Sequence, residues 1–201
     1  MAPKTKAQFE EVRQEKRELI LETALEIFAT YGYHAASISM IAQHAGIAKG
    51  LLYNYFESKE ALLKAVINTG FKDFFEIFTP LFDENFSEEM FTTEQFRNLI
   101  KKVFKIMQDN IHFWRLYFAL AFQPGVTEII YQDYKDMMIS QFDLLKKYYK
   151  KQGSKNPKAD AVHTNAVMDG LMINITQSTP NFDDKKLIES ILKQLEKPLY
   201  N

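Results

Sequence analysis

Apolar residues recur at helical spacing along almost the whole chain, and this pattern limits the possible fold more than any other feature of the sequence. The clearest example starts at Ile20 and repeats at Ala24, Ile27, Phe28 and Tyr31. It predicts an amphipathic helix over about residues 13–30, ended by Gly32. No stretch alternates apolar and polar residues between hairpin turns, as a half-buried strand would. The chain is therefore expected to be all-α.

Residues that favour the beginning or the end of a helix divide the rest of the chain into further helices. The expected total is about nine. Two short helices and a long one, closed by Pro80, follow the first. Thr92 and Gln95 have the capping-box spacing, which predicts a helix over 92–110. Further helices are expected over 113–122 (ended by residues 123–125), 127–151, from 156 to Pro180, and from 183 or 184 onward, where Asp183 or Asp184 is the cap. We expect two domains, residues 1–58 and 59–201.

The composition fits a globular protein and excludes several kinds of site. Of the 201 residues, 46% are hydrophobic, which is enough for a substantial core. The chain has no cysteine, which excludes disulfides, thiolate metal sites and cysteine nucleophiles. The first residues lack the apolar stretch of a secretory signal, and the longest apolar run, 116–122, is far short of the roughly 20 residues that cross a bilayer. We therefore expect a cytoplasmic protein that does not span a membrane.

The segment from Ser37 to Leu63, SISMIAQHAGIAKGLLYNYFESKEALL, is the most informative about function. Bulk charge does not favour nucleic-acid binding, because the chain sums to -1. Ser37 is a suitable N-cap for a short helix that ends at Gly46, and a second short helix begins near Ala48. Ser58 then caps a longer helix. Two short helices joined by a glycine-containing tight turn are typical of the helix-turn-helix, whose second helix enters the major groove of DNA.

The identity and spacing of the residues over positions 13–63 resemble those of the TetR, or tetracycline-repressor, family of bacterial transcriptional regulators. The residues that carry the resemblance are Ile20, Ala24, Phe28, Gly32, Tyr33, Ile41, Ala42, Ala45, Gly46, Lys49, Gly50, Leu51, Leu52, Tyr53, Asn54, Tyr55, Phe56, Ser58, Lys59 and Glu60. The resemblance implies an N-terminal helix-turn-helix domain and a C-terminal helical domain for ligand binding and dimerisation. It implies a ligand-responsive regulator, usually a repressor, that binds palindromic double-stranded operator DNA as a homodimer and is released by a small-molecule effector.

The resemblance also assigns contacts to DNA. The residues expected to bind DNA are Ser37, Ser39, Ala48, Lys49, Gly50, Leu51, Tyr53, Asn54, Tyr55 and Lys59. Gly50 lets the backbone approach a base edge closely, and Lys49 beside it can neutralise a phosphate. Ala48 and Leu51 depart from the family pattern, in which a capping serine or threonine and a small polar residue are usual. Phe56 is expected in the core.

Basic residues lie before the first expected helix, at Lys4, Lys6 and Arg13. They fit either a flexible arm that reaches the flanking duplex or a disordered, solubilising tail. The sequence leaves this choice open.

Residues 93–201 carry no recognisable motif but are dense in aromatic residues and methionine. Such side chains line adaptable apolar cavities, and they equally fill a helical core. The residues predicted to bind a ligand are Phe104, Met107, Trp114, Tyr117, Phe118, Tyr134, Met138, Gln141, Phe142, Asn165, Met168 and Met172. The effector is expected to be small and largely apolar or aromatic.

Residues 166–175, AVMDGLMINI, are apolar nearly all round the expected helix, so one face can pack within the chain while another needs a partner. The residues predicted to form a dimer are Val167, Gly170, Leu171, Asn174, Ile188, Ile191, Leu192 and Leu195. Such a dimer would hold two recognition helices about 34–36 Å apart, on successive turns of a palindrome.

The sequence contains no catalytic, cofactor-binding or metal-binding pattern. The histidines, at positions 34, 44, 112 and 163, lack metal-ligand spacing, and no phosphate-binding glycine loop or nucleophile elbow occurs. We therefore expect no enzyme and no cofactor. Two alternatives to a ligand-responsive repressor stay open: a DNA-binding protein controlled by a protein partner, and a helical carrier whose helix-turn-helix is vestigial.

Overall fold

The computed structural model describes residues 5–78, 91–177 and 185–200, apart from the side chains of residues 73–75. Within these ranges every regular element is an α-helix, which confirms the all-α prediction. The chain forms two compact units, one of residues 1–70 with 116–131 and one of residues 71–115 with 132–201. The predictions for Lys4, Pro80, Pro180, Asp183 and Asp184 fall outside the described residues.

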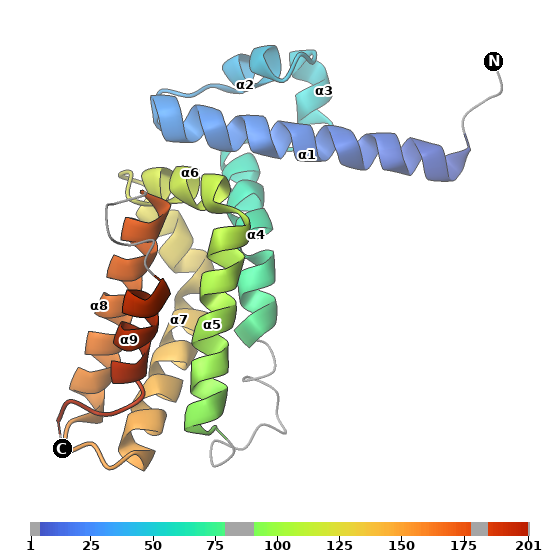
Figure 1. Cartoon of the computed structure of the whole chain (residues 1–201). Helices are drawn as coiled ribbons and strands as arrows, with labels where there is room; N and C mark the ends of the chain where they lie inside the picture. The colour runs from blue at the N-terminus through green and yellow to red at the C-terminus, as the bar shows by residue number, and fades with distance from the viewer. Residues whose placement is uncertain (1–4, 79–90, 178–184, 201) are drawn as a thin grey trace. The chain divides into compact units, whose positions relative to one another are not determined.

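The first unit contains α1 (Lys6–Tyr31), α2 (Ile38–His44), α3 (Lys49–Tyr53) and the start of α4 (Lys59–Phe78). α2 packs against both α1 and α3, and the three are drawn in blue and cyan in Figure 1. The core face of α1 consists of Ile20, Leu21, Ala24, Leu25, Ile27 and Phe28. This is the face that the apolar spacing predicted, and Gly32 ends the helix as expected.

α1 begins at Lys6, well before the predicted start near residue 13. Thr5 and Gln8 form a capping box: the Gln8 amide donates to Thr5 Oγ1 at 3.3 Å, and the Thr5 amide donates to Gln8 Oε1 at 2.9 Å. The apolar pattern missed this part because its residues are exposed and form no buried stripe. Lys6 and Arg13 therefore lie in a helix, which excludes a flexible arm or a disordered tail from residue 6 onward.

The second unit is built from the rest of α4, α5 (Thr93–Asp109), α8 (Pro157–Thr176), α9 (Lys185–Gln194) and parts of α6 (Ile111–Ala121) and α7 (Val126–Lys151). α5 packs against α8 and α9 (Figure 1). In the core Phe96 stacks on Tyr148, with ring centres 4.5 Å apart. The predicted capping box of Thr92 and Gln95 is present.

Asn156 and Pro157 start α8 as the sequence predicted. Asn156 Oδ1 accepts a hydrogen bond from the Ala159 amide at 3.2 Å, and Pro157 occupies the first turn. Among the described helices, none is long and apolar enough to cross a bilayer.

Candidate nucleic-acid interface

The turn between α2 and α3 is a Schellman motif, the two-bond cap of a helix C-terminus. Ala45 ends α2, and Gly46 follows with a φ of +64°. The Gly46 amide donates to the Gln43 carbonyl at 3.2 Å, and the Ile47 amide donates to the Ala42 carbonyl at 3.0 Å. Because a positive φ favours glycine, Gly46 fixes the direction in which the chain leaves α2 and enters α3.

α3 has one buried and one exposed face. Leu52 is fully buried, and Phe56, just beyond the helix, lies in the core as predicted. On the other face Leu51 is 37% exposed and Tyr53 is 47% exposed, although both carry large apolar groups. Leu52 and Phe56 therefore pack α3 against the first unit, and the opposite face of α3 stays available for contacts outside the chain.

The outer face of α3 also carries Lys49, Gly50 and Asn54, which are exposed. A Cβ added at Gly50 would meet no atom within 4 Å, so packing inside the chain does not require glycine there. Glycine weakens a helix relative to alanine. Neither packing nor helix stability within the first unit therefore accounts for the glycine at position 50.

The residues around α3 differ in their exposure and contacts. Ser37 Oγ accepts from the Met40 amide at 3.2 Å and caps α2, and its hydroxyl can still donate to a phosphate. Ser39 is exposed, and Tyr55 is half-buried. Ala48 is the N-cap of α3 and makes no side-chain cap, as its departure from the family pattern predicted.

Lys59 is half-buried and points into the first unit. Its Nζ donates to the carbonyl oxygens of Tyr33 at 2.8 Å, His34 at 3.2 Å and Ala36 at 2.9 Å. An ammonium group has three donors, so these bonds account for all of them. A contact between Lys59 and a DNA phosphate would have to replace one of these bonds, and it stays a prediction.

Gln123, in the turn between α6 and α7, holds the end of α1. Its Oε1 accepts from the Tyr33 amide at 2.6 Å, and its Nε2 donates to the carbonyls of Phe28 at 3.0 Å and Ala119 at 3.1 Å. His34 Nε2 lies 2.9 Å from the Pro124 carbonyl oxygen. The sequence indicated only a helix end at residues 123–125, because nothing local marks a contact across 90 positions.

Two of the predicted ligand-binding residues, Trp114 and Tyr134, meet through Phe71 of α4. The ring centre of Phe71 lies 5.8 Å from that of Trp114 and 5.5 Å from that of Tyr134. Burial raises the pKa of Tyr134 to about 12, with a smaller contribution from the charge of Asp133. Sequence reasoning missed Phe71, whose helical spacing is equally typical of an ordinary core residue.

The other predicted ligand-binding residues range from the core to the surface. Buried residues are Phe104, Met107 and Tyr117, and half-buried ones are Phe118, Gln141, Phe142, Asn165, Met168 and Met172. Phe104 belongs to the core of the second unit, and Phe142 and Met168 pack against that core. Met138 is 40% exposed. Their role as ligand contacts stays a prediction.

Half of the predicted dimer residues lie inside the chain's own core. The buried ones are Leu171, Ile188, Leu192 and Leu195. Val167 and Ile191 are half-buried and pack against the same core, while Gly170 and Asn174 are half-buried. Sequence reasoning did not distinguish the inner from the outer face, because the segment is apolar nearly all round. Exposed apolar surface on α8 is found instead at Val162, which is 53% exposed.

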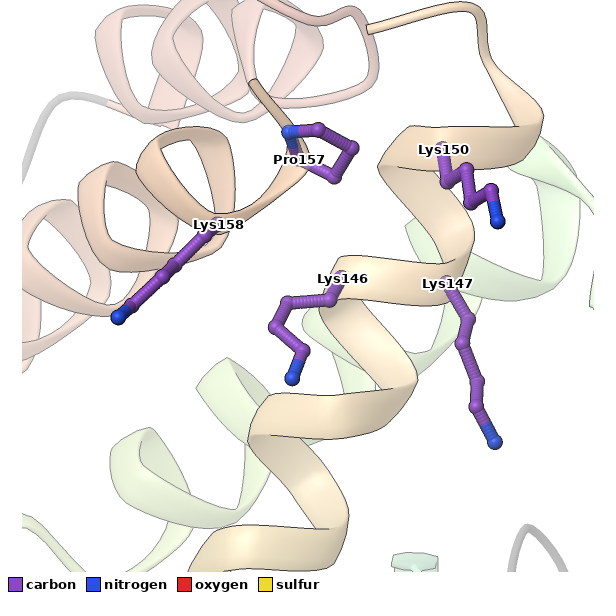
Figure 2. A pocket seen from close by; sticks show the side chains of 5 residues that line it. All are labelled: Lys146, Lys147, Lys150, Pro157 and Lys158. Atoms are coloured by element: carbon purple, nitrogen blue, oxygen red, sulfur yellow. The ribbon is translucent and has the colours of Figure 1, made fainter. Parts of the chain in front are cut away.

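Two hollows on the second unit are lined by charged residues. The first, of about 340 Å³, is lined by Lys146, Lys147, Lys150, Pro157 and Lys158. Figure 2 shows that its ammonium groups point in several directions and do not converge on one point. The second, of about 330 Å³, lies over α5 and α9, beside the ion pair of Arg97 and Glu196. Neither is lined by the predicted ligand-binding residues.

Residues 20–66 match the family model described as bacterial regulatory proteins, tetR family. Among curated proteins, a 55-residue stretch is 51% identical to the uncharacterized HTH-type transcriptional regulator YuxN of Bacillus subtilis, covering 27% of this chain and 19% of that protein. An 88-residue stretch is 33% identical to the fatty acid metabolism regulator protein of the same species, covering 44% of this chain and 43% of that protein. The chain thus matches less than half the length of these two relatives.

Solved structures share the fold over most of the chain. A TetR-like transcriptional regulator from a Rhodococcus species matches with a TM-score of 0.65 and 22% identity, over 90% of this chain and 93% of that one. The transcriptional regulator FadR from Bacillus subtilis, in complex with stearoyl-CoA, matches with a TM-score of 0.66 and 21% identity, over 89% and 96%. Residues 20–66, which include the helix-turn-helix, thus match the tetR family of bacterial regulatory proteins, and the chain shares its fold with solved TetR-like regulators.

Proposed function

We propose that the chain is a ligand-responsive repressor that binds palindromic operator DNA as a homodimer and is released by a small, largely apolar effector. The observation that carries the DNA part is the outer face of α3. Leu51 and Tyr53 stand exposed there beside Lys49, around a glycine that packing does not require. Exposed apolar groups next to a cation suit a thymine methyl beside a phosphate.

In this proposal the residues divide into two roles. Gly50, Leu51, Tyr53 and Asn54 lie near bases, and Lys49, Ser37, Ser39 and Tyr55 hold the phosphate backbone. The Schellman turn at Gly46 fixes α3 relative to α2, so the second group sets the register in which the first group meets the bases.

The test of operator binding is selection of duplexes from a random oligonucleotide pool by the wild-type chain. We expect an inverted repeat whose half-site centres are about one helical turn apart. Footprinting should show two equivalent protected segments. Enrichment of a single half-site without a repeat, or no enrichment at low salt, would contradict the proposal.

The proposed dimer uses the outer face of α8. Val162, Ala166 and Ile173 lie on one side of that helix, since they are spaced by four and seven residues. A Cβ at Gly170 would meet no atom within 4 Å, so there is room for another backbone. Val162→Glu should raise the dissociation constant of the dimer in sedimentation experiments, whereas Asn98→Glu, an exposed position on α5, should not. Equal effects of the two changes would argue against this face.

The proposed effector has a long apolar chain. The support is the aromatic group of Phe71, Trp114 and Tyr134, together with FadR, which is seen in complex with stearoyl-CoA. We expect stearoyl-CoA to change Trp114 fluorescence and to release the selected duplex, and coenzyme A alone to do neither. Failure of a broad panel of apolar and aromatic compounds would favour control by a protein partner. A regulator of this kind acts where the DNA is, in the cytoplasm, and catalyses no reaction.

A further inference from the structure

Lys59 lies in the first turn of α4, is half-buried, and points at the loop between α1 and α2. The loop carbonyls of residues 33, 34 and 36 all accept from its Nζ, at 2.8, 3.2 and 2.9 Å. The same nitrogen lies 4.6 Å from the centre of the Tyr33 ring. This one side chain therefore satisfies three acceptors of the loop. Each of these bonds has a charged donor, which makes it stronger than a bond between neutral groups.

The loop that Lys59 holds leads directly into the DNA-binding helices. Gly32 opens it with a φ of +87°, and the Ala36 amide donates to the Gly32 carbonyl at 3.0 Å. Ser37 then caps α2. Because the loop makes no regular ladder of backbone bonds, its carbonyls depend on side-chain donors for their position. Lys59 thereby fixes the start of α2 relative to α4.

We propose that Lys59 is a positioning residue for DNA recognition, which holds the α1–α2 loop and the N-terminus of α2 in place and does not itself neutralise a phosphate. Its three donors are engaged inside the protein. Turning one of them toward DNA would leave a loop carbonyl without its bond. Lys49, exposed on α3, is in this proposal the lysine that contacts a phosphate. Substitutions of the two lysines should therefore affect the salt dependence of DNA binding differently.

The salt dependence of duplex binding separates the two roles, because each phosphate contact adds about 0.9 to the slope of log affinity against log salt concentration. The probe is a duplex selected by the wild-type chain or, if none is selected, a random-sequence duplex at low salt. For Lys59→Met we expect affinity to fall about tenfold or more, a loss as large as one mismatched base pair causes, with an unchanged slope. For Lys49→Met we expect the slope to fall by about 0.9.

Lys59→Arg is the second variant, and it keeps the charge. A guanidinium contacts phosphate as well as an ammonium does, but its planar fork does not direct three donors to three converging carbonyls. Positioning therefore predicts weaker binding for Lys59→Arg, whereas a phosphate contact predicts wild-type binding. Wild-type affinity of this variant, or a slope lowered by about 0.9 in Lys59→Met, would overturn the proposal.

Amide hydrogen exchange supplies a readout that does not involve DNA. We expect the Ala36 and Met40 amides to exchange about tenfold faster or more in Lys59→Met, and amides of α5 to be unchanged. Binding is measured well below the melting temperature of each variant, so that unfolding does not contribute. A lower melting temperature with unchanged duplex affinity would show a role in stability alone and would also overturn the proposal.

Discussion

The guanidinium of Arg97 on α5 holds both carboxylate oxygens of Glu196, which lies 99 positions later, just beyond α9. The Nε to Oε1 distance is 2.5 Å and the Nη2 to Oε2 distance is 2.6 Å. The hydrogen bond from Arg97 is the largest cause that lowers the pKa of Glu196, and the Arg97 charge adds to it. Tyr148 OH also donates to the Glu196 carbonyl, at 2.8 Å. The C-terminal end of the chain is therefore fastened to α5 and α7.

This pair predicts an acid-sensitive contribution to stability. A lowered pKa in the folded state means that the contribution is complete above the ordinary glutamate pKa, about 4.3, and is lost as the pH falls through the lowered value. Arg97→Met should reduce the free energy of unfolding measurably at neutral pH, by a modest amount because the Arg97 side chain is partly exposed to solvent. Urea denaturation at pH 7 and below pH 4 measures it. Lys102→Met on the same helix is the control, and a loss as large at low pH as at pH 7 would refute the assignment.

Gly50→Ala should separate stability from DNA binding. Alanine has open space at this position and a better helix propensity, so we expect the free energy of unfolding to stay the same or rise by up to about 1 kcal/mol. The added methyl group should keep α3 from the base edges and weaken binding of a selected duplex about tenfold or more. Gly46→Ala is the matched control: its φ of +64° is strained for alanine, so it should lower stability by about 1–2 kcal/mol. Unchanged duplex affinity in Gly50→Ala would show that no close approach occurs there.

Lys49→Ala should lower the salt slope of duplex binding by about one unit, because one fewer phosphate is neutralised. Its side chain is exposed on α3, so the melting temperature should stay near that of the wild type. Titrations at four or more salt concentrations give the slope. Lys102→Ala, on α5, serves as the charge control, and an unchanged slope in Lys49→Ala would remove Lys49 from the phosphate contacts.

Gln123→Leu should loosen the end of α1. The substitution keeps the approximate size but removes the acceptor for the Tyr33 amide and the donor for the Phe28 and Ala119 carbonyls. Leaving partly buried backbone groups without partners costs about 1–3 kcal/mol, which should appear as a lower melting temperature. Gln132→Leu, an exposed position on α7, is the control. If both variants melt alike, these bonds contribute nothing to stability.

Much of the fold follows from local signals in the sequence. The capping box of Thr92 and Gln95, the end of α1 at Gly32, the turn at Ala45 and Gly46, and the Asn156–Pro157 start are each specified by residues within one turn of the helix end. The buried face of α1 followed from its spacing. The start of α1 did not, because an exposed, charged helix has no apolar stripe and depends on the capping box at Thr5.

The sequence by itself determined the all-helical fold, the helix-turn-helix and the outer residues of α3, because these depend on contacts between near neighbours. Only the tertiary structure decided which apolar face of α8 turns inward, that Lys59 is engaged with the α1–α2 loop, and that Gln123 holds α1 across 90 positions. The physical reason is that packing and long-range hydrogen bonds join residues far apart in the sequence, and such contacts leave no periodic pattern from which they could be predicted. The local sequence around a lysine or glutamine is the same whether its side chain donates hydrogen bonds to water or to a backbone carbonyl.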